Sequence, residues 1–132
     1  MKLITRDTDY ALKALCFIAK SKAEIVSVSE FTRQLRMPRP FLRKILQVLN
    51  RRGILRSLKG QGGGFSLARP PQKVFLIDIM RIFQGELSLN ECFLKKMVCP
   101  DQSHCLLRNQ ITRIERYVLG KLGSISIASL IK

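Results

Sequence analysis

In the first half of the chain, apolar residues recur at three- and four-residue steps, as they do on the buried face of a helix. The first run predicts a helix that has Asp7 or Thr8 as its N-cap and ends near Lys20. A short second helix is expected to start near Ser27 or Ser29 and to run to about Leu35, before the break at residues 36–40. This proline-containing break separates the second helix from a third.

A third helix separates apolar from basic side chains most clearly. It is expected to begin at Pro38 or Pro40, because a missing N–H costs nothing in a first turn, and to end before Gly53. Its core face carries Phe41, Leu42, Ile45, Leu46 and Leu49. Its opposite face carries Arg39, Arg43, Lys44, Gln47 and Arg51. A short helix, a turn and a basic helix predict a helix-turn-helix, whose second helix enters the major groove of DNA; a solvated surface helix shows the same pattern.

A predicted β-hairpin follows this third helix directly. Residues 54–58 and 65–69 have strand character and flank a glycine-rich connection over residues 59–64. Its glycines permit positive φ angles and a close approach to phosphates, and the connection lacks the Gly-Lys-Ser/Thr ending of a nucleotide-binding loop. The expected fold is therefore mainly α with a small β-hairpin wing, a winged helix-turn-helix. The candidate DNA contacts are Arg39, Pro40, Phe41, Arg43, Lys44, Gln47, Lys59, Gly60 and Gln61.

The second half is organised differently. Residues 74–83 read as a buried segment leading into a short helix that ends near Gly85, and a long helix is expected from about Ser103 to Lys121. The long helix has a stripe of Leu106, Leu107, Ile111, Ile114, Val118 and Leu122. A second copy of the chain would cover this stripe, unless the helix lies back on its own domain. We therefore expect a DNA-binding domain over residues 1–71 and a cysteine-loop and dimerisation region over residues 72–132.

Charge strengthens the expectation of a polyanionic partner. The 132 residues carry 24 Lys and Arg against 9 Asp and Glu, a net charge of +15, with mean hydropathy +0.06. Residues 31–77 contain no carboxylate but 11 Lys and Arg. Because solvated surfaces normally intersperse both signs, this stretch favours double-stranded nucleic acid as the partner over an anionic membrane.

Three cysteines follow in close succession in the second half. Cys92, Cys99 and Cys105 are spaced C-x₆-C-x₅-C around a loop-like stretch that contains Pro100. Thiolates crowded on a loop are suited to zinc or an iron–sulfur cluster, although buried cysteines also serve as small apolar residues. Cys16, in the apolar first helix, is assigned to that packing role.

The chain resembles the Rrf2 family of winged-helix transcriptional regulators, which includes the iron–sulfur sensors IscR and NsrR. The resemblance rests on LITRDTDYALKAL at residues 3–15, FLRKILQVL at 41–49 and, most specifically, GQGGGFSLAR at 60–69. It continues through residues 77–79, 84–85, the three cysteines and residues 126–130.

The resemblance implies a homodimeric regulator, expected to be a repressor, that binds a near-palindromic promoter site. In many members the three cysteines of each subunit hold a 2Fe–2S or 4Fe–4S cluster whose state controls DNA binding. Some relatives add a histidine three residues after the last cysteine, where this chain has Arg108. In other relatives, a carboxylate from the first helix of the partner subunit is the additional ligand, and Asp9 occupies the matching position in this chain. Asp9 is equally well explained as a carboxylate that the helix dipole favours near a helix N-terminus.

Other classes of function are weaker. An enzyme is disfavoured because the chain has one histidine, few carboxylates and no nucleophile–base constellation. An electron carrier would not need a basic helix and a wing. A winged-helix regulator with structural zinc, or with a direct thiol redox switch, remains the alternative. No apolar run is long enough to span a bilayer and no signal peptide is visible, so a cytoplasmic protein without a membrane partner is expected.

Overall fold

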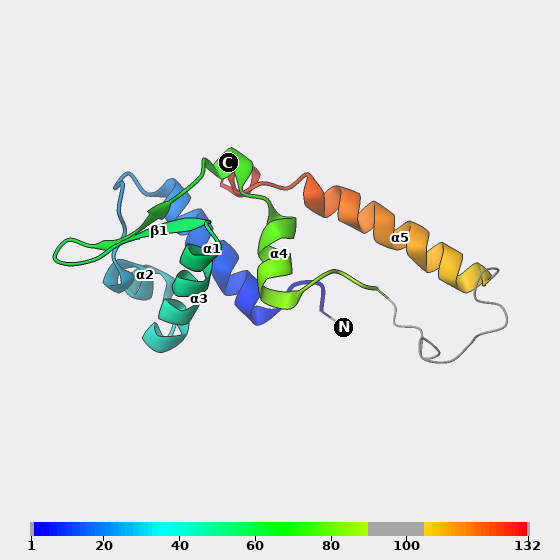
Figure 1. The fold of residues 1–132 in the computed structure, drawn as a ribbon, viewed down its shortest axis with the longest axis horizontal. Coiled ribbons are helices and arrows are strands. Elements are labelled where there is room, and N and C mark those ends of the chain that lie inside the picture. Colours follow the sequence, from blue (N-terminus) through cyan, green and yellow to red (C-terminus); the bar gives the residue numbers. More distant parts are fainter. Residues whose placement is uncertain (1, 90–104, 132) are drawn as a thin grey trace.

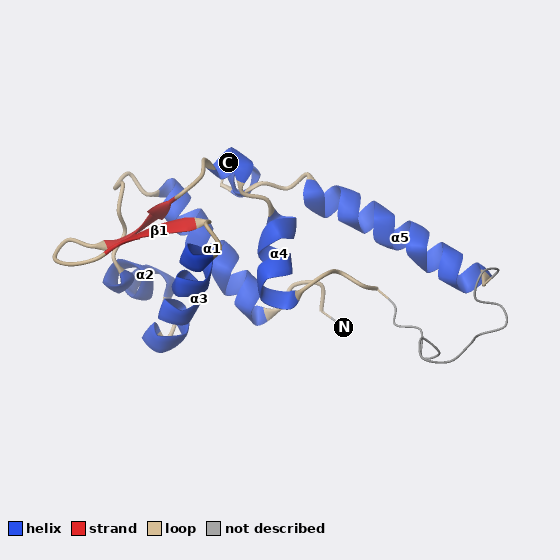
Figure 2. Ribbon diagram, viewed as in Figure 1, coloured by secondary structure: helices blue, strands red, loops and turns tan. Residues whose placement is uncertain are grey.

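The computed structural model describes residues 2–89 and 105–131. Helices dominate these ranges, and a two-stranded antiparallel hairpin is their one sheet (Figure 2). The elements are α1 (Arg6–Lys20), α2 (Val28–Leu35), α3 (Arg39–Arg51), β1 (Leu55–Leu58), β2 (Gly64–Leu67), the 3-10 helix η1 (Pro71–Lys73), α4 (Leu76–Gln84), α5 (Leu106–Gly123) and α6 (Ile127–Leu130). The mainly helical class with a small β-hairpin is confirmed.

The starts of the first two helices depend on side-chain caps. The hydroxyl of Ser27 accepts the Glu30 backbone N–H at 3.2 Å, so Ser27, the first of the two predicted starts, is the N-cap of α2. For α1 the prediction was wrong: the N-cap is Thr5, whose hydroxyl accepts the Thr8 N–H at 3.4 Å. Asp7 lies inside the first turn instead, where the helix dipole favours negative charge. Thr5, Asp7 and Thr8 are all residue types that cap helices, and their closeness made this boundary ambiguous.

The turns on either side of α3 are set by left-handed residues. Arg36 ends α2 at φ 53°, a conformation that a non-glycine residue adopts at a cost of roughly 1–2 kcal/mol. At the other end, Gly53 has φ 79° and its N–H donates to the Asn50 carbonyl at 3.1 Å, while the Ile54 N–H donates to the Leu49 carbonyl at 2.9 Å. These two bonds form a Schellman motif, so α3 ends as its glycine predicts.

The larger of two hydrophobic clusters joins elements from both halves of the chain. Helices α1, α2 and α3 contribute Ala11, Ala14, Leu15, Ile18, Phe31, Leu42, Ile45, Leu46 and Leu49, all buried. Val74, Ile79 and Ile127 belong to the same core, because α4 and α6 pack against α1. Residues beyond position 71 therefore help to hold the winged-helix part together, and the division at residues 71/72 stays a prediction.

The end of α4 is tied to the start of α1 by one amide side chain. Gln84 Oε1 accepts the Thr5 backbone N–H at 3.1 Å and the Thr8 hydroxyl at 2.7 Å, and Gln84 Nε2 donates to the Leu3 carbonyl at 2.9 Å. Thr8 is completely buried, so this bond satisfies a hydroxyl that water cannot reach. Gly85, at φ 77°, then ends α4 as expected.

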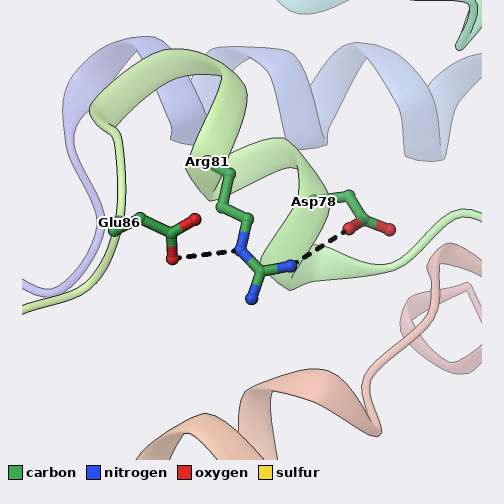
Figure 3. A network of polar contacts seen from close by, with 3 residues as sticks. All are labelled: Asp78, Arg81 and Glu86. Carbon is green, nitrogen blue, oxygen red and sulfur yellow. Dashed lines mark hydrogen bonds and ion pairs between the residues drawn. The ribbon is translucent and has the colours of Figure 1, made fainter.

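An exposed ion-pair network marks the same end of α4. Figure 3 shows the Arg81 guanidinium between two carboxylates, with Nη1 3.7 Å from Asp78 Oδ1 and Nε 3.3 Å from Glu86 Oε2. Because all three side chains face solvent, the network contributes little stability. It does connect α4 to the residues that follow Gly85.

Helix α5 projects from the rest of the molecule with its first turn farthest out; the chain runs inward along it and continues to α6, which lies beside η1 (Figure 1). The predicted stripe is present, but only Leu122 of it is buried; Leu106 is 79% exposed and Leu107 66%. The expected start near Ser103 lies outside the described residues, and the described helix has Cys105 as its N-cap. In the described ranges, no helix combines the length and apolarity required to cross a bilayer.

Candidate nucleic-acid interface

The third helix presents its basic side to solvent. Its buried side consists of Leu42, Ile45, Leu46 and Leu49. Arg39, Pro40, Arg43, Lys44 and Gln47 are all exposed, whereas Phe41 is partly buried against the core. Packing thus fixes the helix by its apolar face and leaves the cations available for a partner.

The wing is a short hairpin anchored to the helical body. Leu58 pairs with Gly64 across β1 and β2, so β2 begins one residue before the predicted Phe65. Phe65 also exchanges two backbone hydrogen bonds of 2.9 Å with Val26, which precedes α2. At the tip, Gly60 adopts φ 96°. The wing therefore has a fixed base and an exposed tip, which carries the three predicted wing residues Lys59, Gly60 and Gln61.

A groove of about 470 Å³ separates the wing from the helices. It brings together three predicted DNA contacts, Arg39 and Gln47 of α3 and Lys59 of the wing. Its remaining lining is mostly small or polar and includes Ser27, Ser29, Asn50, Ser57 and Gly63. A second hollow, of about 450 Å³, contains Pro40, Phe41 and Lys44 together with Arg6 and Pro38. Arg43, Gly60 and Gln61 are exposed outside both hollows.

The charges of this surface are not neutralised within the described ranges. There, no cation of α3 or of the wing pairs with a carboxylate; the ion pairs lie on α1, between Lys13 and Asp9 at 2.7 Å, and around Arg81 at the end of α4. Unpaired cations on a helix and a neighbouring hairpin favour a polyanion.

Arg6 is a member of this surface that the sequence patterns did not reveal. Its guanidinium carbon lies 5.1 Å from the centroid of the Phe41 ring, in a cation–π contact between α1 and α3. No spacing rule connects positions so far apart in the chain. The sequence offered one indication that Arg6 contacts a polyanion, the excess of cations over carboxylates in residues 1–70. This excess does not distinguish Arg6 from the other cations.

The cysteine site is only partly described. Cys92 and Cys99 lie outside the described residues. Cys105 is half-buried, and its sulfur accepts the Arg108 backbone N–H at 3.5 Å. In residues 2–89 and 105–131, no three His, Cys, Asp or Glu side chains are grouped closely enough to bind a metal ion.

Two further residues from the sequence analysis lie on α1. Asp9 forms the ion pair with Lys13 and keeps 45% of its side chain exposed, and its hydrogen bond to Lys13 raises the pKa of that lysine. Cys16 packs against the core, and burial raises the pKa of its thiol, an effect that nearby Lys20 partly offsets. The packing explanation of Cys16 agrees with this environment.

A helix-turn-helix with an exposed basic second helix, followed by a hairpin with a glycine-rich tip, defines a winged-helix DNA-binding protein. The chain belongs to the Rrf2 family, described as an iron-dependent transcriptional regulator, which matches residues 4–132. The chain is thus a DNA-binding transcriptional regulator, as the resemblance implied.

Individual relatives agree with this assignment. A chain of Aquifex aeolicus, predicted to be a helix-turn-helix transcriptional regulator, is 32% identical over 92% of this chain and 86% of its own length. The transcriptional regulator NsrR of Bacillus licheniformis is 29% identical over 81% of this chain and 71% of its own length. Because these relatives are regulators, the expectation that the chain is not an enzyme is confirmed.

Solved structures share the fold. CymR, the global cysteine regulator of B. subtilis, superimposes with a TM-score of 0.83 at 23% identity, covering 99% of this chain and 97% of CymR. IscR of T. potens gives a TM-score of 0.75 at 22% identity, covering 99% of this chain and 86% of that one. The winged-helix architecture predicted from the sequence is therefore confirmed.

Proposed function

We propose that this regulator is a homodimer whose promoter binding responds to an iron–sulfur cluster, of the 2Fe–2S or 4Fe–4S type, held by Cys92, Cys99 and Cys105. The carrying observation is the occurrence of this cysteine triplet, after a winged helix, in a chain whose family is described as iron-dependent. Residues 1–71 would bind DNA, and residues 72–132 would hold the cluster and dimerise. The direction of control is expected to be repression.

The described donor fits such a cluster. Cys105 offers a soft thiolate, the donor that iron–sulfur clusters use, directly before α5. Its sulfur already accepts a backbone N–H from Arg108, and hydrogen bonds of this kind tune a cluster's reduction potential. A bound cluster would supply a centre that is sensitive to redox state and to iron supply.

The exposed stripe of α5 supports the homodimer. Leu106, Leu107 and Ile114 of the stripe, and Tyr117 beside it, are each more than half exposed, on a helix whose N-terminal part projects from the body of the molecule (Figure 1). Apolar surface of this extent is normally covered, and a second copy of α5 presents the same stripe in return. A dimer also gives two recognition helices for two half-sites.

For DNA, we propose that α3 enters the major groove and the wing contacts the backbone beside it. Arg43 and Lys44 would face base edges, with Arg39, Pro40, Phe41 and Gln47 at the borders of the contact. Lys59, Gly60 and Gln61 would approach phosphates from the wing. The support is the shared exposure of these positions and the groove that joins Arg39, Gln47 and Lys59.

Anaerobic reconstitution with iron and sulfide tests the cluster. We expect a brown protein with charge-transfer absorption, and loss of that absorption when Cys92, Cys99 or Cys105 is replaced by serine. Cys16→Ser is the matched control and should keep the spectrum, because Cys16 packs against the core. A colourless protein with stoichiometric zinc, or one that responds only through thiol oxidation, would contradict the proposal. Footprinting on the protein's own promoter would then identify the responsive DNA.

Asp9 is the candidate for the remaining ligand, which Asp9 of the partner subunit would donate across the dimer. Asp9→Ala should then make the cluster labile and shift its absorption without unfolding the protein. An unchanged spectrum and DNA response would leave Asp9 with its observed role, the ion pair with Lys13.

A further inference from the structure

A hollow at the N-terminal end of α3 is built by two elements that are distant in sequence. It has a volume of about 450 Å³ and is lined by Arg6 from α1 and by Pro38, Pro40, Phe41 and Lys44 from the start of α3. Its two charged members, Arg6 and Lys44, are both exposed cations, and the rest of the lining is apolar. No residue of the hollow carries a negative charge.

The Arg6 side chain is held in position by aromatic packing. Its guanidinium carbon lies 5.1 Å from the Phe41 ring centroid. The Phe41 ring is in turn fixed by Tyr10, edge to face, with centroids 5.4 Å apart and an interplanar angle of 88°. An arginine held over a ring by a cation–π contact still has N–H donors available, and it loses less conformational entropy when those donors bind a ligand.

Arg6 is also unneutralised in the described ranges. The nearest carboxylate along its helix face, that of Asp9, is paired with Lys13 at 2.7 Å, and no described carboxylate pairs with Arg6. A pre-positioned guanidinium of this kind needs an anion, and phosphate is the anion that its fork of donors matches best.

The position of Arg6 decides which part of DNA it meets. It lies on α1, beside the first turn of α3, and not on the helix expected to read base edges. Phosphates border the groove that such a helix enters, and sugars beside them would face the prolines and Phe41 of the hollow. Phosphate contacts fix the register of a protein on DNA, whereas base contacts select the sequence.

We propose that Arg6, held by its cation–π contact with Phe41 and sharing the hollow with Lys44, binds a backbone phosphate of DNA at the edge of the α3 contact. This site extends the DNA surface from α3 and the wing onto α1. It rests on the proposed docking of α3, but it does not depend on the cluster.

The test measures binding of a random-sequence duplex as a function of salt, with cluster-free protein. Arg6→Gln removes one cation at the hollow. Lys20→Gln removes one cation at the far end of the same helix, about 21 Å away along its axis. We expect the slope of log K against log salt to fall in magnitude by about 0.9 for Arg6→Gln, the value for one lost phosphate contact, and to stay near wild type for Lys20→Gln.

A double-mutant cycle tests the stacking. Phe41→Leu keeps apolar bulk but removes the ring, so the Arg6→Gln effect on the slope should be smaller in that background. Equal slopes for Arg6→Gln, Lys20→Gln and wild type would overturn the phosphate site while leaving the cluster proposal intact. Loss of binding confined to one operator sequence would instead make Arg6 a base-reading residue. A wild-type protein that binds no duplex at low salt would overturn the site and the DNA role of α3 together.

Discussion

The amide of Gln84 bonds to three positions near the start of α1, and one of them, the Thr8 hydroxyl, is fully buried. Gln84→Leu removes these bonds at nearly constant volume. It should lower the free energy of unfolding by roughly 1–3 kcal/mol, because the Thr5 N–H, the Leu3 carbonyl and the buried Thr8 hydroxyl each lose a hydrogen bond; Thr8 keeps its 3.1 Å contact with the Thr5 hydroxyl. Urea denaturation at fixed protein concentration measures the change. Gln72→Leu, at an exposed position of η1, is the control and should cost far less; equal losses would remove any special role for Gln84.

Truncation of Arg43 and truncation of Lys59 should weaken DNA binding in different ways. Arg43→Ala should weaken binding to the operator by about 1–3 kcal/mol and relax preference at particular base pairs, as loss of a base contact does. Lys59→Ala should weaken binding to all sequences alike and flatten the salt dependence. Competition binding with a library of operator variants separates the two outcomes. Uniform weakening by Arg43→Ala would move Arg43 from the base-reading set to the phosphate-binding set.

At the scale of elements, the wing depends on a glycine where two backbones meet. A Cβ atom on Gly64 would collide with the backbone of Val26, the residue that bonds to Phe65. Gly64→Ala should therefore displace the hairpin, destabilise the protein by about 1–3 kcal/mol and weaken DNA binding. Gly120→Ala is the contrasting control, because its Cβ would meet open space within α5. It should stabilise the protein by roughly 0.5–1 kcal/mol; similar losses for both variants would refute the steric explanation.

Elements whose ends are set by adjacent residues could be predicted well. The Ser27 cap and the Gly53 stop are local signals, and both ends lie where the sequence places them. The start of α1 was missed because Thr5, Asp7 and Thr8 are all good caps, and the bonds of Gln84 decide between them. Such tertiary contacts leave no periodic trace in a sequence.

At the scale of the whole molecule, the exposed stripe of α5 should control assembly. Ile114→Glu places a charge in that stripe and should convert the dimer to a monomer, lowering operator affinity because two half-sites are no longer bound together. Thr112→Glu adds the same side chain on the opposite face of α5 and should leave the dimer intact. Analytical ultracentrifugation reports the mass of each variant. A wild-type protein that sediments as a monomer would contradict the proposed dimer.

The part of the candidate site that lies on α3 could be predicted, because it follows from the periodicity that also predicts the helix. The basic face of α3 follows from a 3.6-residue period, and the exposure of Arg39, Arg43 and Lys44 agrees with it. The contact of Arg6 with Phe41 depends instead on how α1 crosses α3, which no local pattern encodes. The ligand set of the proposed cluster stays a prediction, because Cys92 and Cys99 lie outside the described residues.

The chain has no tryptophan and only two tyrosines, and the structure places one beside each proposed interface. Tyr10 packs on the Phe41 ring beside the DNA surface, and Tyr117 is 69% exposed beside the α5 stripe. The intrinsic ultraviolet fluorescence of the protein therefore comes from two emitters with separate assignments. With Tyr10→Phe, the remaining emission would report self-association alone, and with Tyr117→Phe it would report events at the start of α3. The molecule thus carries its own pair of optical probes, and binding and assembly can be followed independently without an attached dye.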